Sequence, residues 1–227
     1  MMKRSLAALL LILSSDFARA QTSDLGSWFT LSATKSLGRG LHLTLDQELR
    51  LKNNVQTINL FYTNIGFDYK LNRYIRISPV YRFIDKHRSD DSYGIRHRFM
   101  LDVAFKMKPG RFILGYRARF QSEWADRSYG SSFGNVPDVY LRHQFKVAYK
   151  ITDELTPYAA CELRFAIHDP HLPYVKGFDS SRLYLGTSYD INDNNAAGIY
   201  FLVQKDWNVN DPQTLYVIGF EYSLTID

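Results

Sequence analysis

The sequence has few of the features that mark disulfide-stabilised, helical membrane or nucleic-acid-binding proteins. Its 227 residues include one cysteine, Cys161, which cannot form an internal disulfide. After residue 20, no apolar run approaches the roughly 20 residues that a transmembrane helix needs. The formal net charge is +5 and no basic run stands out, so we expect no nucleic-acid partner.

Sequence motifs of common catalytic and cofactor sites are missing as well. The chain has no phosphate-binding glycine loop and no Cys–His cluster. We therefore expect no cofactor and no metal site. Aromatic residues, in contrast, are abundant, with 16 tyrosines and 15 phenylalanines, although the mean hydropathy is negative, at −0.28. Many aromatics in a chain of low hydropathy are typical of a membrane barrel with a polar interior.

The N-terminus has the organisation of an export signal. A short basic segment is followed by an apolar run from Leu6 to Leu13 and by small residues at Ala18 and Ala20. This order predicts a cleaved secretory signal peptide over residues 1–20 and a mature domain over residues 21–227. Removing the signal leaves 25 basic and 22 acidic residues, a net charge of +3.

Residues 93–124 show the clearest structural pattern, because two runs of strict alternation flank a turn at Met107–Gly110. Apolar residues such as Phe99 and Leu114 occupy one parity, and arginines such as Arg98 and Arg117 recur on the other. A period of two places the two sets on opposite faces of a β-hairpin. Each run is about a dozen residues long, which suits a tilted membrane-spanning strand.

The same alternation recurs along the chain and predicts an all-β fold. Short turns and longer connections take turns, as in outer-membrane barrels. Ten strands between Leu41 and Ile226 satisfy the even count of such barrels, with both ends on the periplasmic side. A weaker strand at Ser27–Lys35 makes eleven, so we expect it inside or beside the barrel, or accompanied by a twelfth strand. The prediction is a single antiparallel transmembrane β-barrel of the outer-membrane type with 10–12 strands.

Two local features refine this prediction. Pro79 interrupts a strand and cannot donate a ladder hydrogen bond, so we expect a β-bulge there. The last strand carries Gly219-x-x-Tyr222-x-Leu224, which resembles the signal that the outer-membrane assembly machinery reads. We therefore expect export by the general secretory route, assembly by that machinery, and contact with outer-membrane lipid and lipopolysaccharide. A protein partner is also compatible with the sequence, but none is identified.

Strand-embedded arginine motifs also suggest a family. Across the mature chain, the order of elements resembles the uncharacterised outer-membrane family known as domain of unknown function 2490. The residues that carry the resemblance are Trp28, Glu48-Leu49-Arg50, Tyr81-Arg82, Arg96-His97-Arg98, Gly115-Tyr116-Arg117-Ala118-Arg119, Arg142-His143, Glu162-Leu163-Arg164 and Arg182. The resemblance implies a barrel in a Gram-negative outer membrane and brings no established activity.

The polar parity of the strands predicts which side chains line the lumen. These are Arg50, Arg76, Arg82, Arg96, Arg98, Arg117, Arg119, Arg142, Arg164 and Arg182, with Glu48, Asp102, Glu123 and Glu162 among the acids. One interpretation is a packed interior braced by arginine–carboxylate pairs. The other is a positively lined constriction that favours anions, because rings of charge set selectivity in pores. Unpaired arginines are costly inside a barrel wall, so the acidic partners favour bracing.

A second group of polar residues lies in the longer connections. It comprises Asp85, His87, Asp90, His168, Asp169 and His171. Neighbouring Asp and His side chains can activate water by general-base catalysis. The leading hypothesis is nevertheless a narrow, anion-preferring channel or a structural or partner-binding subunit of the outer membrane, without enzymatic activity. The alternative is a surface-exposed hydrolase that uses these rim residues.

Overall fold

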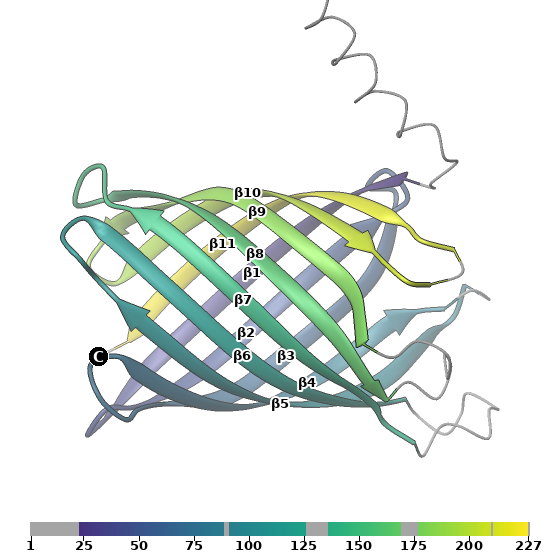
Figure 1. Cartoon of the computed structure of the whole chain (residues 1–227), viewed down its shortest axis with the longest axis horizontal. Helices are drawn as coiled ribbons and strands as arrows, with labels where there is room; N and C mark the ends of the chain where they lie inside the picture. Colours follow the sequence, from purple (N-terminus) through teal and green to yellow (C-terminus); the bar gives the residue numbers. More distant parts are fainter. Residues whose placement is uncertain (1–22, 89–90, 126–135, 169–176, 210, 227) are drawn as a thin grey trace, which may run out of the picture.

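The computed structural model describes residues 23–88, 91–125, 136–168, 177–209 and 211–226, and these form a closed β-barrel (Figure 1). The predicted signal peptide, residues 1–20, lies outside the described residues. The strands are β1 (Ser23–Gly38), β2 (Leu41–Lys52), β3 (Thr57–Lys70), β4 (Ile75–His87), β5 (Tyr93–Met107), β6 (Phe112–Ala125), β7 (Asp138–Tyr149), β8 (Leu155–His168), β9 (Gly177–Asn192), β10 (Asn195–Asp206) and β11 (Thr214–Ile226). The predicted fold class is confirmed.

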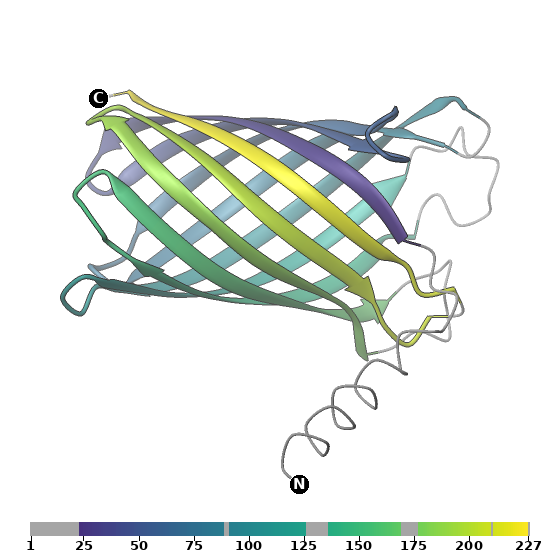
Figure 2. The same ribbon diagram turned by 90° about the horizontal axis from the view of Figure 1, so that it is seen from above.

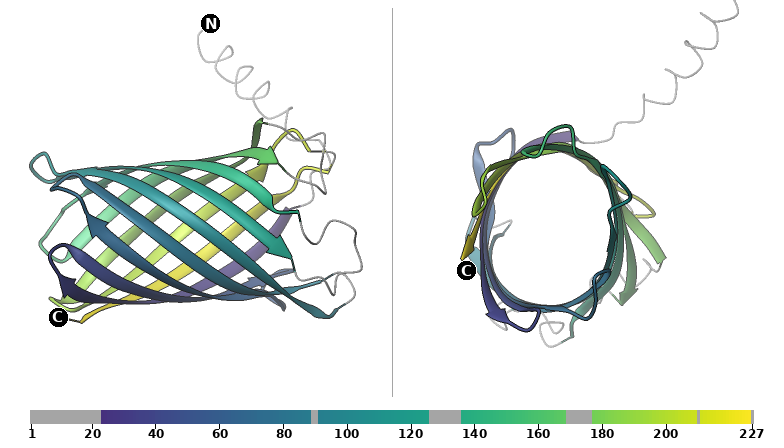
Figure 3. Two further views of the ribbon diagram at one scale, coloured as in Figure 1. Left: turned by 90° about the horizontal axis from the view of Figure 1, so that it is seen from below. Right: turned by 90° about the vertical axis from the view of Figure 1, so that its left-hand side faces the viewer.

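The alternating sequence pattern becomes two faces of one wall. Viewed along the axis, the strands form a single ring (Figure 3). In the hairpin β5–β6, the apolar parity points outward: Phe99 is 55% exposed and Phe120 is 46% exposed. The opposite parity points inward, where Asp102, Gln121 and Glu123 are buried. Among the described residues, no helix is long and apolar enough to cross a membrane.

The barrel has two different ends. The connections β1–β2, β3–β4, β5–β6, β7–β8 and β9–β10 lie at one end, which we call the short-turn end, together with the end of β11 (Figures 1 and 2). The three longest connections, 126–137, 169–176 and 207–213, belong to the opposite end, which we call the long-loop end. The three longest connections lie at the predicted end, but the β2–β3 connection, residues 53–56, is as short as the turns of the opposite end.

The N-terminal strand closes the barrel, which corrects the prediction for residues 27–35. Strand β1 lies in the wall between β2 and β11, neither inside nor beside the barrel. Its pairing with β2 is antiparallel, but its pairing with β11 is parallel and runs from Ser23–Thr214 to Lys35–Ile226. With eleven described strands, the first and last run in the same direction. Strand β1 therefore begins at the long-loop end, whereas β11 ends at the short-turn end.

Small and aromatic residues hold this parallel seam together. The hydroxyl of Ser27 donates to the carbonyl of Ile218 at 3.0 Å, and the rings of Phe29 and Phe220 stack with centroids 5.3 Å apart. Inside the barrel, the ring of Tyr200 on β10 covers Gly219 of β11, because a Cβ at Gly219 would lie 2.0 Å from its Cζ atom. Gly219 is therefore required here to let an aromatic ring lie against the strand.

The expected β-bulge at Pro79 is wrong. The β3–β4 partners keep the same register on both sides of the proline, from Gly66–Val80 to Tyr69–Ile77, and the β4–β5 ladder passes through Pro79 opposite Leu101 without a shift. Pro79 lacks an N–H group, and next to it the β3–β4 pairing is interrupted between Gly66–Val80 and Tyr69–Ile77 without a change of register. A register shift occurs instead in β9, where Asp179 is an extra residue between Phe178 and Ser180. That bulge also starts β9 at Gly177, earlier than the sequence pattern suggested.

We predict that Gly219→Ala destabilises the barrel by about 1–3 kcal/mol, because the new methyl group collides with the ring of Tyr200. Urea unfolding in lipid vesicles, followed by tryptophan fluorescence, measures the effect. Gly115→Ala is the matched control, since the nearest atom to its Cβ is 3.7 Å away. In a Tyr200→Ala background the cost of Gly219→Ala should largely disappear, and equal costs in both backgrounds would contradict this account.

Candidate functional site

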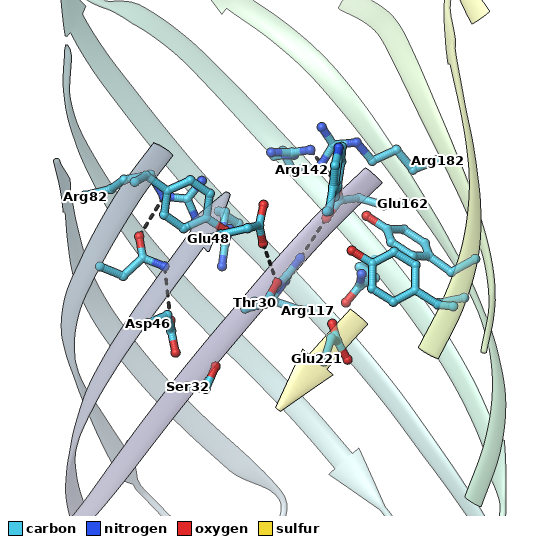
Figure 4. Close-up of a pocket in the computed structure, with 18 of the residues that line it drawn as sticks. Thr30, Ser32, Asp46, Glu48, Arg82, Arg117, Arg142, Glu162, Arg182 and Glu221 are labelled. Carbon is cyan, nitrogen blue, oxygen red and sulfur yellow. Dashed lines mark hydrogen bonds and ion pairs between the residues drawn. The ribbon is translucent and has the colours of Figure 1, made fainter. Parts of the chain in front are cut away.

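Charged side chains that point inward from several strands line the central part of the lumen. Period-two alternation dictates this placement, because each arginine occupies a position whose neighbours along the strand face outward. The charged groups are held by ion pairs across and between strands, which Figure 4 shows for the central part.

Glu162 on β8 is the most heavily used carboxylate. It accepts from Nη2 of Arg117 at 2.7 Å and from Nη2 of Arg142 at 2.5 Å, and Nη1 of Arg182 lies 3.4 Å away. These arginines come from β6, β7 and β9, so one acid links four strands. Glu162 is 3% exposed. A carboxylate buried this deeply is stable only when cations surround it.

Two further carboxylates brace the wall on the β5–β6 side. Asp102 receives both Nε and Nη2 of Arg119, at 2.6 and 2.7 Å, which is the bidentate geometry that matches a guanidinium to a carboxylate. Glu123 receives Nη1 of Arg96 at 2.9 Å and Nε of Arg98 at 2.6 Å. Nη1 of Arg117 also lies 3.9 Å from Asp102, so these two acids hold four arginines and their charges are compensated within the wall.

The β1–β4 side is organised differently. Glu48 accepts from the hydroxyl of Thr30 at 2.9 Å and pairs with Arg50. Arg82 donates from Nε to the side-chain carbonyl of Asn64 at 2.6 Å, and its guanidinium lies 3.5 Å from the ring centroid of Tyr62. No carboxylate of the described residues forms an ion pair with Arg82, although it is only 7% exposed. The positive charge of Arg82 is therefore stabilised by the side-chain amide of Asn64 and the ring of Tyr62.

The charged layer borders a cavity of about 400 Å³. Nine basic side chains line it against four acidic ones. The basic residues are Arg50, Arg82, Arg98, Arg117, Arg119, Arg142, Lys146, Arg164 and Arg182, and the acids are Asp46, Glu48, Glu162 and Glu221. A second cavity of about 280 Å³ shares Arg117, Gln144, Lys146 and Tyr158 with it and extends towards the short-turn end, where Arg76 and Lys106 line it. The lumen is hollow on this side.

Towards the long-loop end, several inward side chains are almost fully buried. Ile84, Leu202 and Val217 are at most 2% exposed, and Trp28 and Tyr62 are also buried. Trp28, Tyr200, Leu202 and Val217 pack into one cluster. The guanidinium of Arg50 lies 3.6 Å from the ring centroid of Trp28 at the edge of this cluster. The described residues therefore form a packed layer above a polar cavity that faces the short turns.

Most of the arginines that the sequence predicted for the lumen line these two cavities. The exception is Arg96, which shares Glu123 with the lining residue Arg98. Arg76, in the second cavity, pairs with Asp68 at 2.7 Å near the short turns. The acids Asp102 and Glu123 lie in the wall, behind the arginines that they bind. Among the described residues, no group of three or more His, Cys, Asp or Glu side chains is placed to hold a metal.

The structure does not gather the described rim residues into a catalytic site. Asp85 and His87 follow each other on one face of β4, whereas His168 ends β8, three intervening strands away. His87 lies 3.3 Å from Asp91, and its Nδ1 atom has no hydrogen-bond partner among the described residues. The other candidates, Asp90, Asp169 and His171, lie outside the described residues.

Several lining residues were not singled out from the sequence. Asp179 accepts from Nε of Arg164 at 3.0 Å, but the β9 bulge interrupts the alternation around it and hides its inward orientation. Asn64 hydrogen-bonds to both Asp46 and Arg82, but it is neutral, so a search of the sequence for charged lumen residues does not find it. Glu221 lies on the inward parity of β11, and that alternation could have identified it.

Comparisons with known proteins agree with this architecture. The family model described as "Protein of unknown function (DUF2490)" matches residues 25–214. The sequence matches no curated protein. Among solved structures, the NanC porin is similar at a TM-score of 0.51 and 13% identity, over 84% of this chain and 93% of that one. A bacterial polysaccharide outer-membrane secretin has a TM-score of 0.47 and 14% identity, over 81% of this chain and 74% of that one. At these identities, the similarity concerns the fold alone.

We predict that Glu162→Gln lowers the free energy of unfolding by about 3 kcal/mol, because it leaves three arginines around a neutral amide. Denaturant unfolding in vesicles measures this change. Glu154→Gln is the control: it removes a carboxylate from an exposed turn and should change stability by less than about 0.5 kcal/mol. Equal effects of the two substitutions would show that Glu162 does not brace the barrel.

Proposed function

We propose that this chain, which belongs to the DUF2490 family of proteins of unknown function, is an integral outer-membrane barrel that acts as a narrow, anion-preferring channel. Its outer wall supports the membrane location. Outward residues along every strand are large and apolar, among them Phe67, Leu101, Phe145, Leu185 and Phe220, each at least 42% exposed. A lipid bilayer is the environment that would cover such a surface.

The observation that carries the anion preference is the excess of positive charge in the lumen. Nine basic side chains line the main cavity, against four acidic ones and three further acids, Asp102, Glu123 and Asp179, that pair with lining arginines from the wall. Arg82 forms no ion pair with any described carboxylate and is almost fully buried. A buried charge without a counterion is costly, so an anion that reaches the cavity compensates it. Small anions are thereby favoured over cations.

The packed layer towards the long-loop end supports a narrow path. Side chains such as Ile84, Leu202 and Val217 leave no exposed surface there, so ions must pass between tightly packed groups. We therefore expect small unitary conductance and infrequent openings. The hydrolase alternative is not carried forward, because its described residues Asp85, His87 and His168 are not brought together.

Planar-bilayer recording tests this proposal directly. In a gradient of potassium chloride, the purified barrel should give small conductance steps whose reversal potential indicates chloride preference. Arg82→Gln should lower the chloride-to-potassium permeability ratio several-fold, since a unit charge across the lumen contributes on the order of 1 kcal/mol at an effective dielectric constant of about 20.

The matched control is Arg73→Gln, which removes an arginine from the β3–β4 turn, outside the cavity. It should leave the permeability ratio unchanged. Cation preference in the unmodified barrel, or an equal response of both variants, would contradict the proposal.

A further inference from the structure

An arginine and a glutamate on different parts of the wall line the main cavity, and neither forms an ion pair with a described residue. Arg82 belongs to β4 and Glu221 to β11, which four steps around the barrel separate. Both line the same cavity, and Figure 4 shows them on different sides of it. Of the other charged lining groups, Glu162 holds three arginines and Glu48 is paired with Arg50. Asp46 accepts from the amide of Asn64, and Lys146 lies over the ring of Tyr158.

Arg82 provides the positive side. Its Nε donates to Asn64, whose Nδ2 in turn donates to Asp46 at 3.0 Å, so the amide orients the guanidinium without neutralising it. Arg98 and Arg119 line the same part of the cavity but are engaged by Glu123 and Asp102. A carboxylate or phosphate of a solute would therefore find Arg82 without competition from a protein carboxylate.

Glu221 provides the negative side. It is exposed to the lumen and forms no hydrogen bond or ion pair with any described residue. Lys146 is a charged neighbour of opposite sign that acts on Glu221 without forming an ion pair with it, and its ammonium group lies 3.7 Å from the ring centroid of Tyr158. Tyr158, Tyr184 and Tyr200 line the wall beside Glu221, and the last two rings are 5.8 Å apart.

A carboxylate bordered by aromatic rings is suited to an ammonium group, which gains an ion pair and cation–π contacts together. Arginine in turn binds carboxylates through a fork of parallel hydrogen bonds. A solute that carries both groups would compensate both unpaired charges at once, whereas a simple anion compensates one. The volume of about 400 Å³ is within the range of small-molecule sites.

We propose that the lumen cavity binds small zwitterions, with the anionic group at Arg82 and the ammonium group at Glu221. This inference rests on the proposed function, because it names the class of solute that the anion-preferring lumen accepts. It also explains why a lumen with excess positive charge retains a free carboxylate. For a purely anionic solute, Glu221 would be repulsive.

Calorimetric titration of the detergent-purified barrel with 4-aminobutyrate, butyrate and butylamine tests the inference. We expect 4-aminobutyrate to bind on the order of tenfold more tightly than butyrate, with butylamine weakest. Glu221→Gln is nearly isosteric and should remove the advantage of 4-aminobutyrate while keeping butyrate binding. Arg82→Gln should weaken both. Ser223→Ala, two residues further along the same face of β11, is the control and should leave the preference intact.

The outcomes separate the two proposals. If butyrate binds, and Arg82→Gln weakens it, but 4-aminobutyrate has no advantage or Glu221→Gln does not alter it, the zwitterion inference is overturned and the anion-preferring channel stands. Tightest binding of butylamine would overturn the zwitterion inference too. If neither butyrate nor 4-aminobutyrate binds and no anion-selective current appears, the proposed function itself fails. Retained far-UV circular dichroism in each variant shows that the barrel is still folded.

Discussion

Pairing of guanidinium and carboxylate groups inside the lumen is the constraint on which this structure depends. A barrel interior shields charges poorly, so a cation placed there must find an anion, an amide or an aromatic face. Glu162, Asp102 and Glu123 each hold two or more arginines, and in doing so they connect β5, β6, β7, β8 and β9. The same contacts that neutralise charge therefore fasten strands that are far apart in sequence.

The bracing and channel interpretations of the arginines are compatible in this lumen. Most of the arginines stabilise the wall, because carboxylates or amides hold them in place. The cavity nevertheless keeps a small positive excess, since nine basic residues line it and seven acids either line it or pair with its arginines. The proposed function rests on the few groups that form no ion pair, among them Arg82 and Glu221.

The seam between β1 and β11 shows how an odd number of strands can close a ring. Parallel pairing is slightly less stable per residue than antiparallel pairing, and here it extends from Ser23–Thr214 to Lys35–Ile226. Its inner side is covered by Tyr200, which lies against Gly219, and its outer side by the stacked rings of Phe29 and Phe220. Side-chain packing on both faces thus supplements the ladder at the point where the barrel closes.

The amino-acid sequence by itself determined the barrel class, the strand parity and the inward orientation of the arginines, because a period of two is a local property of each strand. It also determined which end carries the long connections. The role of β1, the straight passage of β4 through Pro79 and the bulge that turns Asp179 inward were decided only by the tertiary structure. Each depends on the register between strands, which the alternation of a single strand does not specify. For the same reason, the pairing of Glu162 with three arginines and the unpaired state of Arg82 and Glu221 became visible only once all eleven described strands were placed around one lumen.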